Sequence, residues 1–88
     1  MLLLLGLASM AAAWTMSTPY GDHEGSAALE CTVVDYPTGS SIGVTGLEAG
    51  QVVTLWETSS CTGGKVHVFE TDGSVDTTAE TLAFNVLS

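Results

Sequence analysis

Few side chains in this sequence could take part in catalysis. The two histidines are His23, which lies between Asp22 and Glu24, and His67, which lies in an apolar stretch. No nucleophile or metalloprotease pattern accompanies them, because Gly-x-Ser-x-Gly and His-Glu-x-x-His are both absent from the sequence. The sequence therefore predicts no catalytic residues, no cofactor and no metal ligands.

Two carboxylates offer one remaining route to catalysis. Glu57 and Glu70 each follow a predicted strand, and two carboxylates about 5–9.5 Å apart can hydrolyse a glycosidic bond. A chain this short seldom forms the cleft that a sugar chain requires. We therefore expect that the protein is not an enzyme.

The chain begins with an apolar run, Met1–Ala13, that ends in small residues. This pattern is typical of a secretory signal peptide, with a cut before Trp14 or after Ala11. The run is too short to span a membrane, which takes about 20 residues. It contains no Lys or Arg near Met1, so a buried N-terminal helix is the alternative. The leader predicts a secreted, extracellular protein.

Cys31 and Cys61 are the two cysteines, and both follow the predicted leader. An oxidising compartment favours a disulfide between them, and small secreted domains often need such a bond. The bond would close a loop of about 31 residues and add about 3–4 kcal/mol in the chain-entropy model. The alternative is a pair of free thiols. Two isolated cysteines are not the pattern of a zinc or redox site.

The charge balance excludes several classes of partner. Ten acidic residues and one base, Lys65, give a net charge of −9. Such a chain cannot bind nucleic acid by neutralising phosphates, and anionic membranes repel it. The charge favours solubility, and it could also attract a basic partner or Ca²⁺.

Alternating apolar residues divide the chain into an arm and one domain. Residues 14–25 have no clear period and predict a flexible N-terminal arm with Trp14 and Tyr20 exposed. Residues 26–88 predict a β domain, in which Leu29, Cys31 and Val33 face inward along the first strand. Short strands separated by Gly-rich turns predict a small antiparallel sandwich or barrel of about five strands. The expected strands cover residues 27–35, 41–45, 51–57, 65–70 and 82–87.

One segment carries a more specific pattern. Trp56 ends a predicted strand, Gly63 follows seven positions later, and Ser74 lies eleven positions beyond Gly63. A glycine there permits the positive φ with which a hairpin folds back over its sheet, and the aromatic ring then covers the fold. Packing in the core is the simplest role for Trp56, and anchoring a partner is the alternative. The segment 51–86 resembles the Greek-key motif of the βγ-crystallin family.

This resemblance implies a Greek-key β-sandwich and, in some members, calcium sites. The nearest segment to a calcium site, Asp72–Thr77, has the wrong residue order. The leader, the size and the Leu55–Gly64 stretch also resemble small secreted fungal proteins related to crystallin-like killer toxins and effectors. The resemblance implies an effector-like, monomeric protein that binds an extracellular protein or cell-wall ligand. The alternatives are a crystallin-like antimicrobial toxin or hydrolase inhibitor, and a calcium-binding structural module.

Overall fold

The computed structural model describes residues 13–88, which fold into eight strands. The predicted leader, Met1–Ala13, lies outside the described residues except for Ala13. Antiparallel pairing joins every pair of hydrogen-bonded strands. The strands are β1 (Trp14–Thr18), β2 (Gly21–Gly25), β3 (Leu29–Tyr36), β4 (Ser41–Thr45), β5 (Val52–Trp56), β6 (Lys65–Phe69), β7 (Gly73–Asp76) and β8 (Thr81–Leu87).

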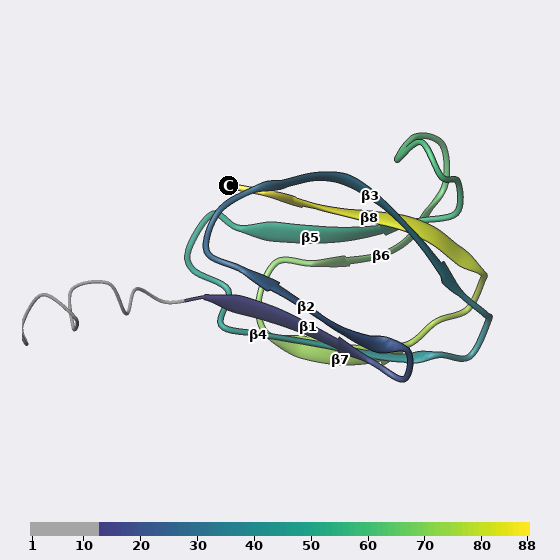
Figure 1. The fold of residues 1–88 in the computed structure, drawn as a ribbon, viewed down its shortest axis with the longest axis horizontal. Helices are drawn as coiled ribbons and strands as arrows, with labels where there is room; N and C mark the ends of the chain where they lie inside the picture. Colours follow the sequence, from purple (N-terminus) through teal and green to yellow (C-terminus); the bar gives the residue numbers. More distant parts are fainter. Residues whose placement is uncertain (1–12) are drawn as a thin grey trace, which may run out of the picture.

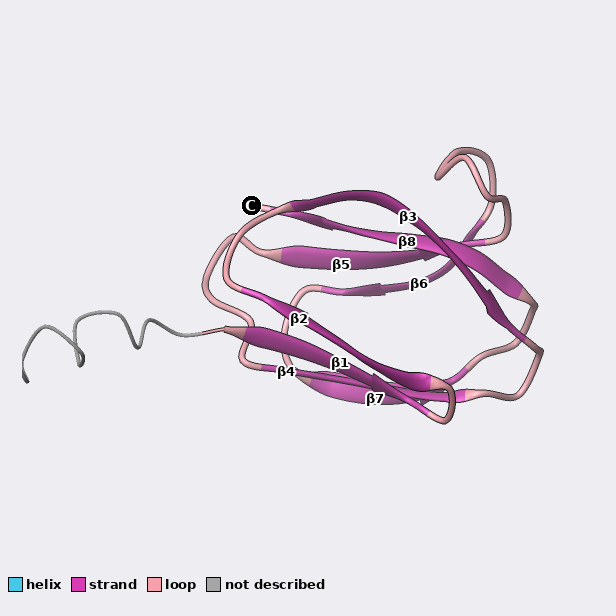
Figure 2. Ribbon diagram, in the orientation of Figure 1, coloured by secondary structure: helices cyan, strands magenta, loops and turns pink. Residues whose placement is uncertain are grey.

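The eight strands form two sheets packed as a sandwich (Figures 1 and 2). One sheet has the order β2-β1-β4-β7, and the other has the order β3-β8-β5-β6. Only β1–β2 and β5–β6 are hairpins of sequential strands, so the chain passes between the sheets at the other connections. The predicted all-β sandwich is therefore confirmed, with eight strands rather than about five.

The strand order repeats along the chain. In β1–β4 the second, first and fourth strands lie side by side, and in β5–β8 the corresponding strands β6, β5 and β8 do the same. The third strand of each set pairs in the opposite sheet, β3 beside β8 and β7 beside β4. This is the order of a Greek key whose third strand has moved to the facing sheet. The topology thus contains a repeat that the sequence does not make evident.

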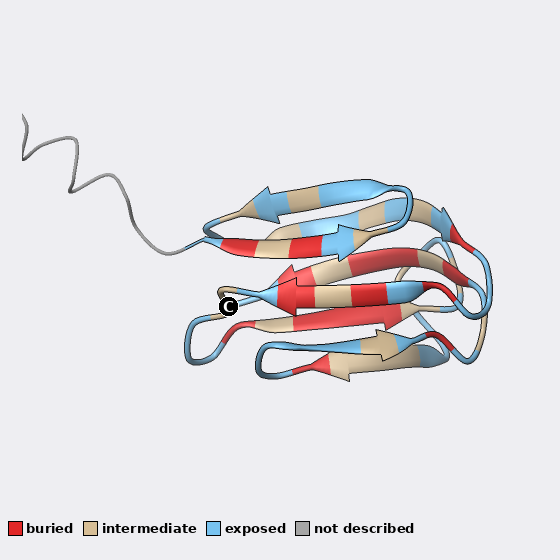
Figure 3. Ribbon diagram, turned by 90° about the horizontal axis from the view of Figure 1, so that it is seen from below, coloured by how far each residue is buried: buried red, intermediate tan, exposed pale blue. Residues whose placement is uncertain are grey.

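The core lies between the central strands of the two sheets, where Figure 3 shows the buried segments in red. Alternate residues of each central strand point inward because successive side chains of a strand face opposite sides. Most of these inward residues are apolar, so the two sheets exclude water from the space between them. The largest side chains of this core are Trp14, Met16, Ile42, Val44, Val53, Leu55, Phe84 and Val86.

The expectation of a flexible arm at residues 14–25 is wrong, because these residues form the β1–β2 hairpin. Trp14 is only 1% exposed, and its Nε1 donates a hydrogen bond to the Ala27 carbonyl oxygen at 2.9 Å. Met16 is fully buried beside it. Tyr20, by contrast, is exposed as expected. The segment lacks a clear apolar period because β2 is an edge strand whose side chains are mostly exposed.

The predicted inward face of β3 is also wrong beyond Leu29. The pairing of β3 with β8 shifts between Leu29 and Thr32, so an irregularity interrupts the alternation. Val34 and Tyr36 pack against the core, while Cys31 and Val33 are exposed on the other side. A register change of one residue exchanges the two faces of a strand. The strand β7 was not predicted either, because its short sequence is largely polar.

The backbone at Gly46, directly after β4, lies against the backbone at Ala13, directly before β1. Gly46 has a φ of +78°, and a Cβ at this position would overlap the carbonyl oxygen of Ala13. Gly46→Ala in a chain that retains Ala13 should lower the free energy of unfolding by about 2–3 kcal/mol, as measured by urea denaturation.

Gly39→Ala is the matched control for this contact. Gly39 also has a positive φ, +89°, but a Cβ there would meet no atom within 4 Å. The control should therefore show only the backbone cost, about 1 kcal/mol. Equal losses in the two variants would contradict the close approach of Ala13 to Gly46.

Candidate interaction surface

The side of the sheet β3-β8-β5-β6 that faces away from the core is the candidate functional surface, and we call it the outer face. Directly paired residues of adjacent strands point to the same side of a sheet. Val53 and Leu55 point into the core, so the residues that alternate with them on β5, Val52, Thr54 and Trp56, point outward. The residues that pair with these three on β6 and β8 point outward as well. Val33 joins them because it pairs with Ala83. The outer face consists of Val33, Val52, Thr54, Trp56, Lys65, Val68, Ala83, Asn85 and Leu87.

The outer face is mainly apolar and partly open to solvent. Val33 is 67% exposed and Leu87 is 54% exposed, while Val52 and Val68 are half-buried. Thr54 and Ala83 at its centre are buried by the surrounding side chains. Val33 pairs with Ala83, so it lies four residues, or about 13 Å, from Leu87 along β8. An apolar face that extends over several strands and is partly exposed is a feature of interaction surfaces.

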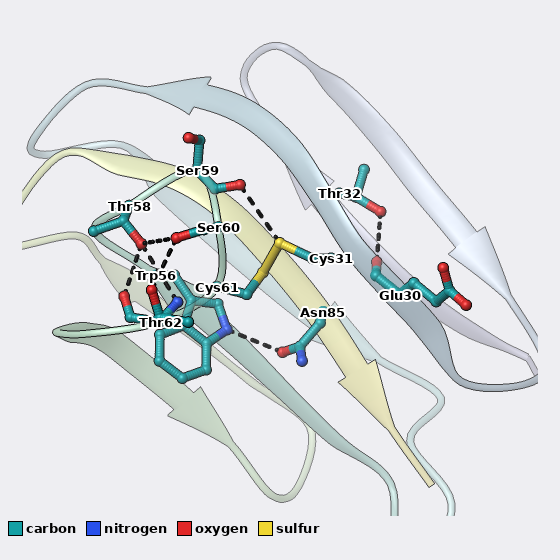
Figure 4. Close-up of a disulfide and its surroundings, with 10 residues drawn as sticks. All are labelled: Glu30, Cys31, Thr32, Trp56, Thr58, Ser59, Ser60, Cys61, Thr62 and Asn85. Carbon is teal, nitrogen blue, oxygen red and sulfur yellow. Dashed lines mark hydrogen bonds between the residues drawn. A yellow bond between two sulfur atoms is a disulfide. The ribbon is translucent and has the colours of Figure 1, made fainter.

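Trp56 belongs to the outer face and not to the core. Its side chain is half-buried, and its Nε1 donates a hydrogen bond of 3.1 Å to Oδ1 of Asn85 (Figure 4). The Lys65 ammonium nitrogen lies 5.6 Å from the centre of its ring, which is a cation–π distance. These two contacts hold the indole in one orientation on the sheet.

A disulfide anchors the loop that rises above one end of the outer face (Figure 1). Cys31 on β3 is bonded to Cys61 in the loop between β5 and β6, with the two Cα atoms 5.8 Å apart. The predicted disulfide is therefore confirmed, and the expected inward direction of Cys31 is not. Cys31 Sγ also lies 3.6 Å from the Ser59 carbonyl oxygen. A disulfide sulfur carries no proton, so this approach is a contact and not a hydrogen bond.

Local hydrogen bonds give the loop its shape (Figure 4). Thr58 Oγ1 donates to the Thr62 carbonyl oxygen at 2.7 Å, and the hydroxyl groups of Ser60 and Thr62 lie 2.8 Å apart. Cys61 adopts a φ of +56°, which is unusual for a residue other than glycine. Side-chain bonds to the backbone of this kind stabilise tight turns.

The three residues of the predicted Greek-key pattern lie in two places. Trp56 and Gly63 belong to one hairpin, and Gly63 has the positive φ that its role requires, +81°. Ser74 lies on β7 in the opposite sheet, where it is exposed and pairs with Gly43. The structure therefore brings Trp56 close to Asn85 and Lys65 rather than to Ser74.

The candidate catalytic residues do not converge. His23 lies on β2 with its ring 5.0 Å from Phe84, and His67 lies on β6 in the other sheet, 4.6 Å from Phe69. Both imidazoles pack against aromatic rings of the sandwich. They therefore lie in hydrophobic surroundings and in separate sheets.

Glu57 and Glu70, the two carboxylates that follow predicted strands, do not face each other. They follow the two strands of an antiparallel hairpin, so they lie at its opposite ends. Five residues of extended chain separate these ends by about 16 Å, which is beyond the spacing of a glycosidase pair. Residues 13–88 also enclose no pocket.

The segment nearest to a calcium pattern has a structural role. Both carboxylate oxygens of Asp72 accept hydrogen bonds from the backbone amides of Gly46 and Leu47, at 3.1 and 2.9 Å. Asp76 lies on β7, opposite Ser41. Within the described part of the chain, no three His, Cys, Asp or Glu residues gather in a way that could hold a metal ion.

Comparisons with known proteins supply no relative. No family model, no curated protein and no solved structure matches this chain. Among residues 13–88, no helix is long and apolar enough to cross a membrane. The outer face and its disulfide-anchored loop are therefore the basis on which a function is inferred.

Proposed function

We propose that this chain is a secreted, non-enzymatic β-sandwich protein that binds an extracellular partner through the outer face, in the manner of an effector. The observation that carries the proposal is the exposure of Val33 and Leu87 on a sheet face that also carries Val52, Val68 and Ala83. Covering this face with a partner would remove aliphatic surface from water, which contributes about 25 cal/mol per Å². The leader pattern and the disulfide support an extracellular location.

The fold presents this face as a rigid surface. The outer face lies on four paired strands, and the loop at its end is held by the disulfide and by the bonds within Thr58–Thr62. A surface that is already ordered loses little conformational entropy on binding. Asn85, which is only half-buried, adds a polar group near the centre, and such groups align a partner on an apolar surface.

The relationship to crystallin-like secreted proteins remains part of the proposal. It is supported by the two interlocked Greek keys and by the hairpin that contains Trp56 and Gly63. The placement of Ser74 in the opposite sheet departs from the simplest form of the pattern.

The proposal predicts that binding depends on the aliphatic side chains of the outer face. Labelled protein is incubated with isolated cell walls and, separately, with immobilised proteins from the extracellular medium, and the retained fraction is titrated. The double variant Val33→Ser/Leu87→Ser should bind about tenfold more weakly than the unchanged protein, because two partly exposed aliphatic groups contribute about 1 kcal/mol or more.

Tyr20→Ser is the matched control for this experiment. Tyr20 is 60% exposed, but it lies at the β1–β2 turn and stacks on Tyr36. Its replacement should leave the binding unchanged. Equal binding by the outer-face variant and the unchanged protein would refute the proposed function.

A further inference from the structure

The charges around the outer face indicate the chemistry of the partner. Glu30 and Asp35 lie on β3, and Glu57 and Glu70 directly follow β5 and β6. All four side chains are exposed. The one base of the chain, Lys65, lies over the Trp56 ring of the same molecule. The apolar face is thus flanked by carboxylates, and its ammonium group already has a partner.

We propose that the outer face binds a cationic protein surface, one in which an apolar side chain is flanked by Lys or Arg. This inference rests on the proposed function and names its class of partner. The aliphatic groups of the partner would cover Val33 and Leu87, and its cations would meet the carboxylates at the rim. Complementary charge raises the rate of association and excludes partners of the same sign.

The same observations argue against a second copy of the chain as the occupant. Each copy carries a net charge of −9, so two outer faces would bring like charges together. Lys65 could offset little of this repulsion, because its ammonium lies over Trp56 in its own chain.

A polysaccharide fits the outer face less well than a protein does. Sugars bind to exposed aromatic rings by stacking on the ring face, and Lys65 lies over that face of Trp56. The exposed groups of the outer face are instead aliphatic. These groups match the apolar side chains of a protein.

The free edge of β3 is a poorer docking site than the face. β3 is an edge strand, and a peptide could add to it by backbone hydrogen bonds. Its pairing with β8 is, however, irregular in two places, between Leu29 and Thr32 and between Val33 and Tyr36. Irregularities and edge charges are features that prevent the addition of a strand.

The test uses three short synthetic peptides whose binding to the intact protein is measured by calorimetry at two salt concentrations. Leu alternates with Lys in the first, Ser alternates with Lys in the second, and Leu alternates with Glu in the third. The Leu–Lys peptide should bind, more weakly at high salt, and the other two should bind at least about tenfold more weakly. Equal binding of the Ser–Lys peptide would overturn the proposal, because charge alone would then explain it.

Two double variants test which carboxylates contribute to peptide binding. Glu30→Gln/Asp35→Asn should weaken binding of the Leu–Lys peptide about fivefold and reduce its salt dependence. Asp22→Asn/Glu24→Gln removes the same charge from β2, in the other sheet, and should have an effect below about twofold. Equal losses from the two pairs would overturn the proposal in favour of general attraction to an acidic protein.

Further measurements separate the remaining outcomes. A dimer that is detected by sedimentation and lost in Val33→Ser/Leu87→Ser would replace the cationic partner with a second copy. Tighter binding of chitosan oligosaccharides than of the Leu–Lys peptide would replace it with a cationic polysaccharide. If retention on extracellular material depends on Val33 and Leu87 but not on Glu30 and Asp35, the proposed function stands and the cationic partner is refuted.

Discussion

Replacement of Trp14 by Ala is expected to lower the free energy of unfolding by about 3–5 kcal/mol, which is a large part of the stability of a small domain. Trp14 is buried between the sheets, where its ring packs edge-on to Phe84 with the ring centres 6.5 Å apart. The substitution would leave a cavity and remove the hydrogen bond from Nε1 to the Ala27 carbonyl oxygen. Urea denaturation followed by far-ultraviolet circular dichroism measures the loss.

Trp56→Ala is the matched control, since it removes the same side chain from the outer face. Trp56 is half-buried and packs against Lys65 and Asn85 rather than in the core. Its removal should cost about 1–2 kcal/mol, because solvent can fill the space that it leaves. A larger loss for Trp56→Ala than for Trp14→Ala would contradict the assignment of Trp14 to the core and of the β1–β2 hairpin to the domain.

Removal of the disulfide is expected to cost about 3–4 kcal/mol. The bond joins the edge strand β3 to the loop after β5, across a sequence separation of 30 residues. Its loss enlarges the ensemble of unfolded conformations, which favours unfolding by the entropy of the released loop. The double variant Cys31→Ala/Cys61→Ala avoids free thiols, and its urea midpoint measures the effect.

A reducing agent supplies the control for the disulfide. Reduction of the unchanged protein should lower its stability by nearly the same amount, and it should leave the double variant unaffected. If the unchanged protein is equally stable with and without reductant, the disulfide does not contribute to the fold. The bonds within Thr58–Thr62 would then be sufficient to hold the loop.

The strands that the sequence predicted are those with strong local patterns. The expected strand at residues 41–45 coincides with β4, and those at 51–57, 65–70 and 82–87 match β5, β6 and β8 closely. Alternation of apolar and polar residues depends on only a few neighbouring positions, so it can be recognised locally. β1, β2 and β7 were missed. β2 and β7 are edge strands of mainly polar residues, and β1 is a short strand within the segment that was expected to be an arm.

The direction of side chains was harder to predict than the strands. Cys31 and Val33 alternate correctly with their neighbours, yet the register shift in β3 places both on the outer side. Trp56 ends a strand whose inner face is apolar, but its place in the alternation turns it outward. The candidate surface therefore could not be assembled from the sequence, because its residues come from four strands and face the same way only once their registers are set.

By itself the sequence determined the all-β class, the partner of each cysteine and the strongly acidic charge. These follow from local alternation, from the presence of only two cysteines and from composition. Only the tertiary structure decided that residues 14–25 belong to the domain and that Val33, Trp56 and Leu87 share an exposed face. The physical reason is that the burial of a side chain, and the side of the sheet to which it points, depend on pairing between strands far apart in the chain. An irregularity of one residue in that pairing reverses the side on which a residue lies.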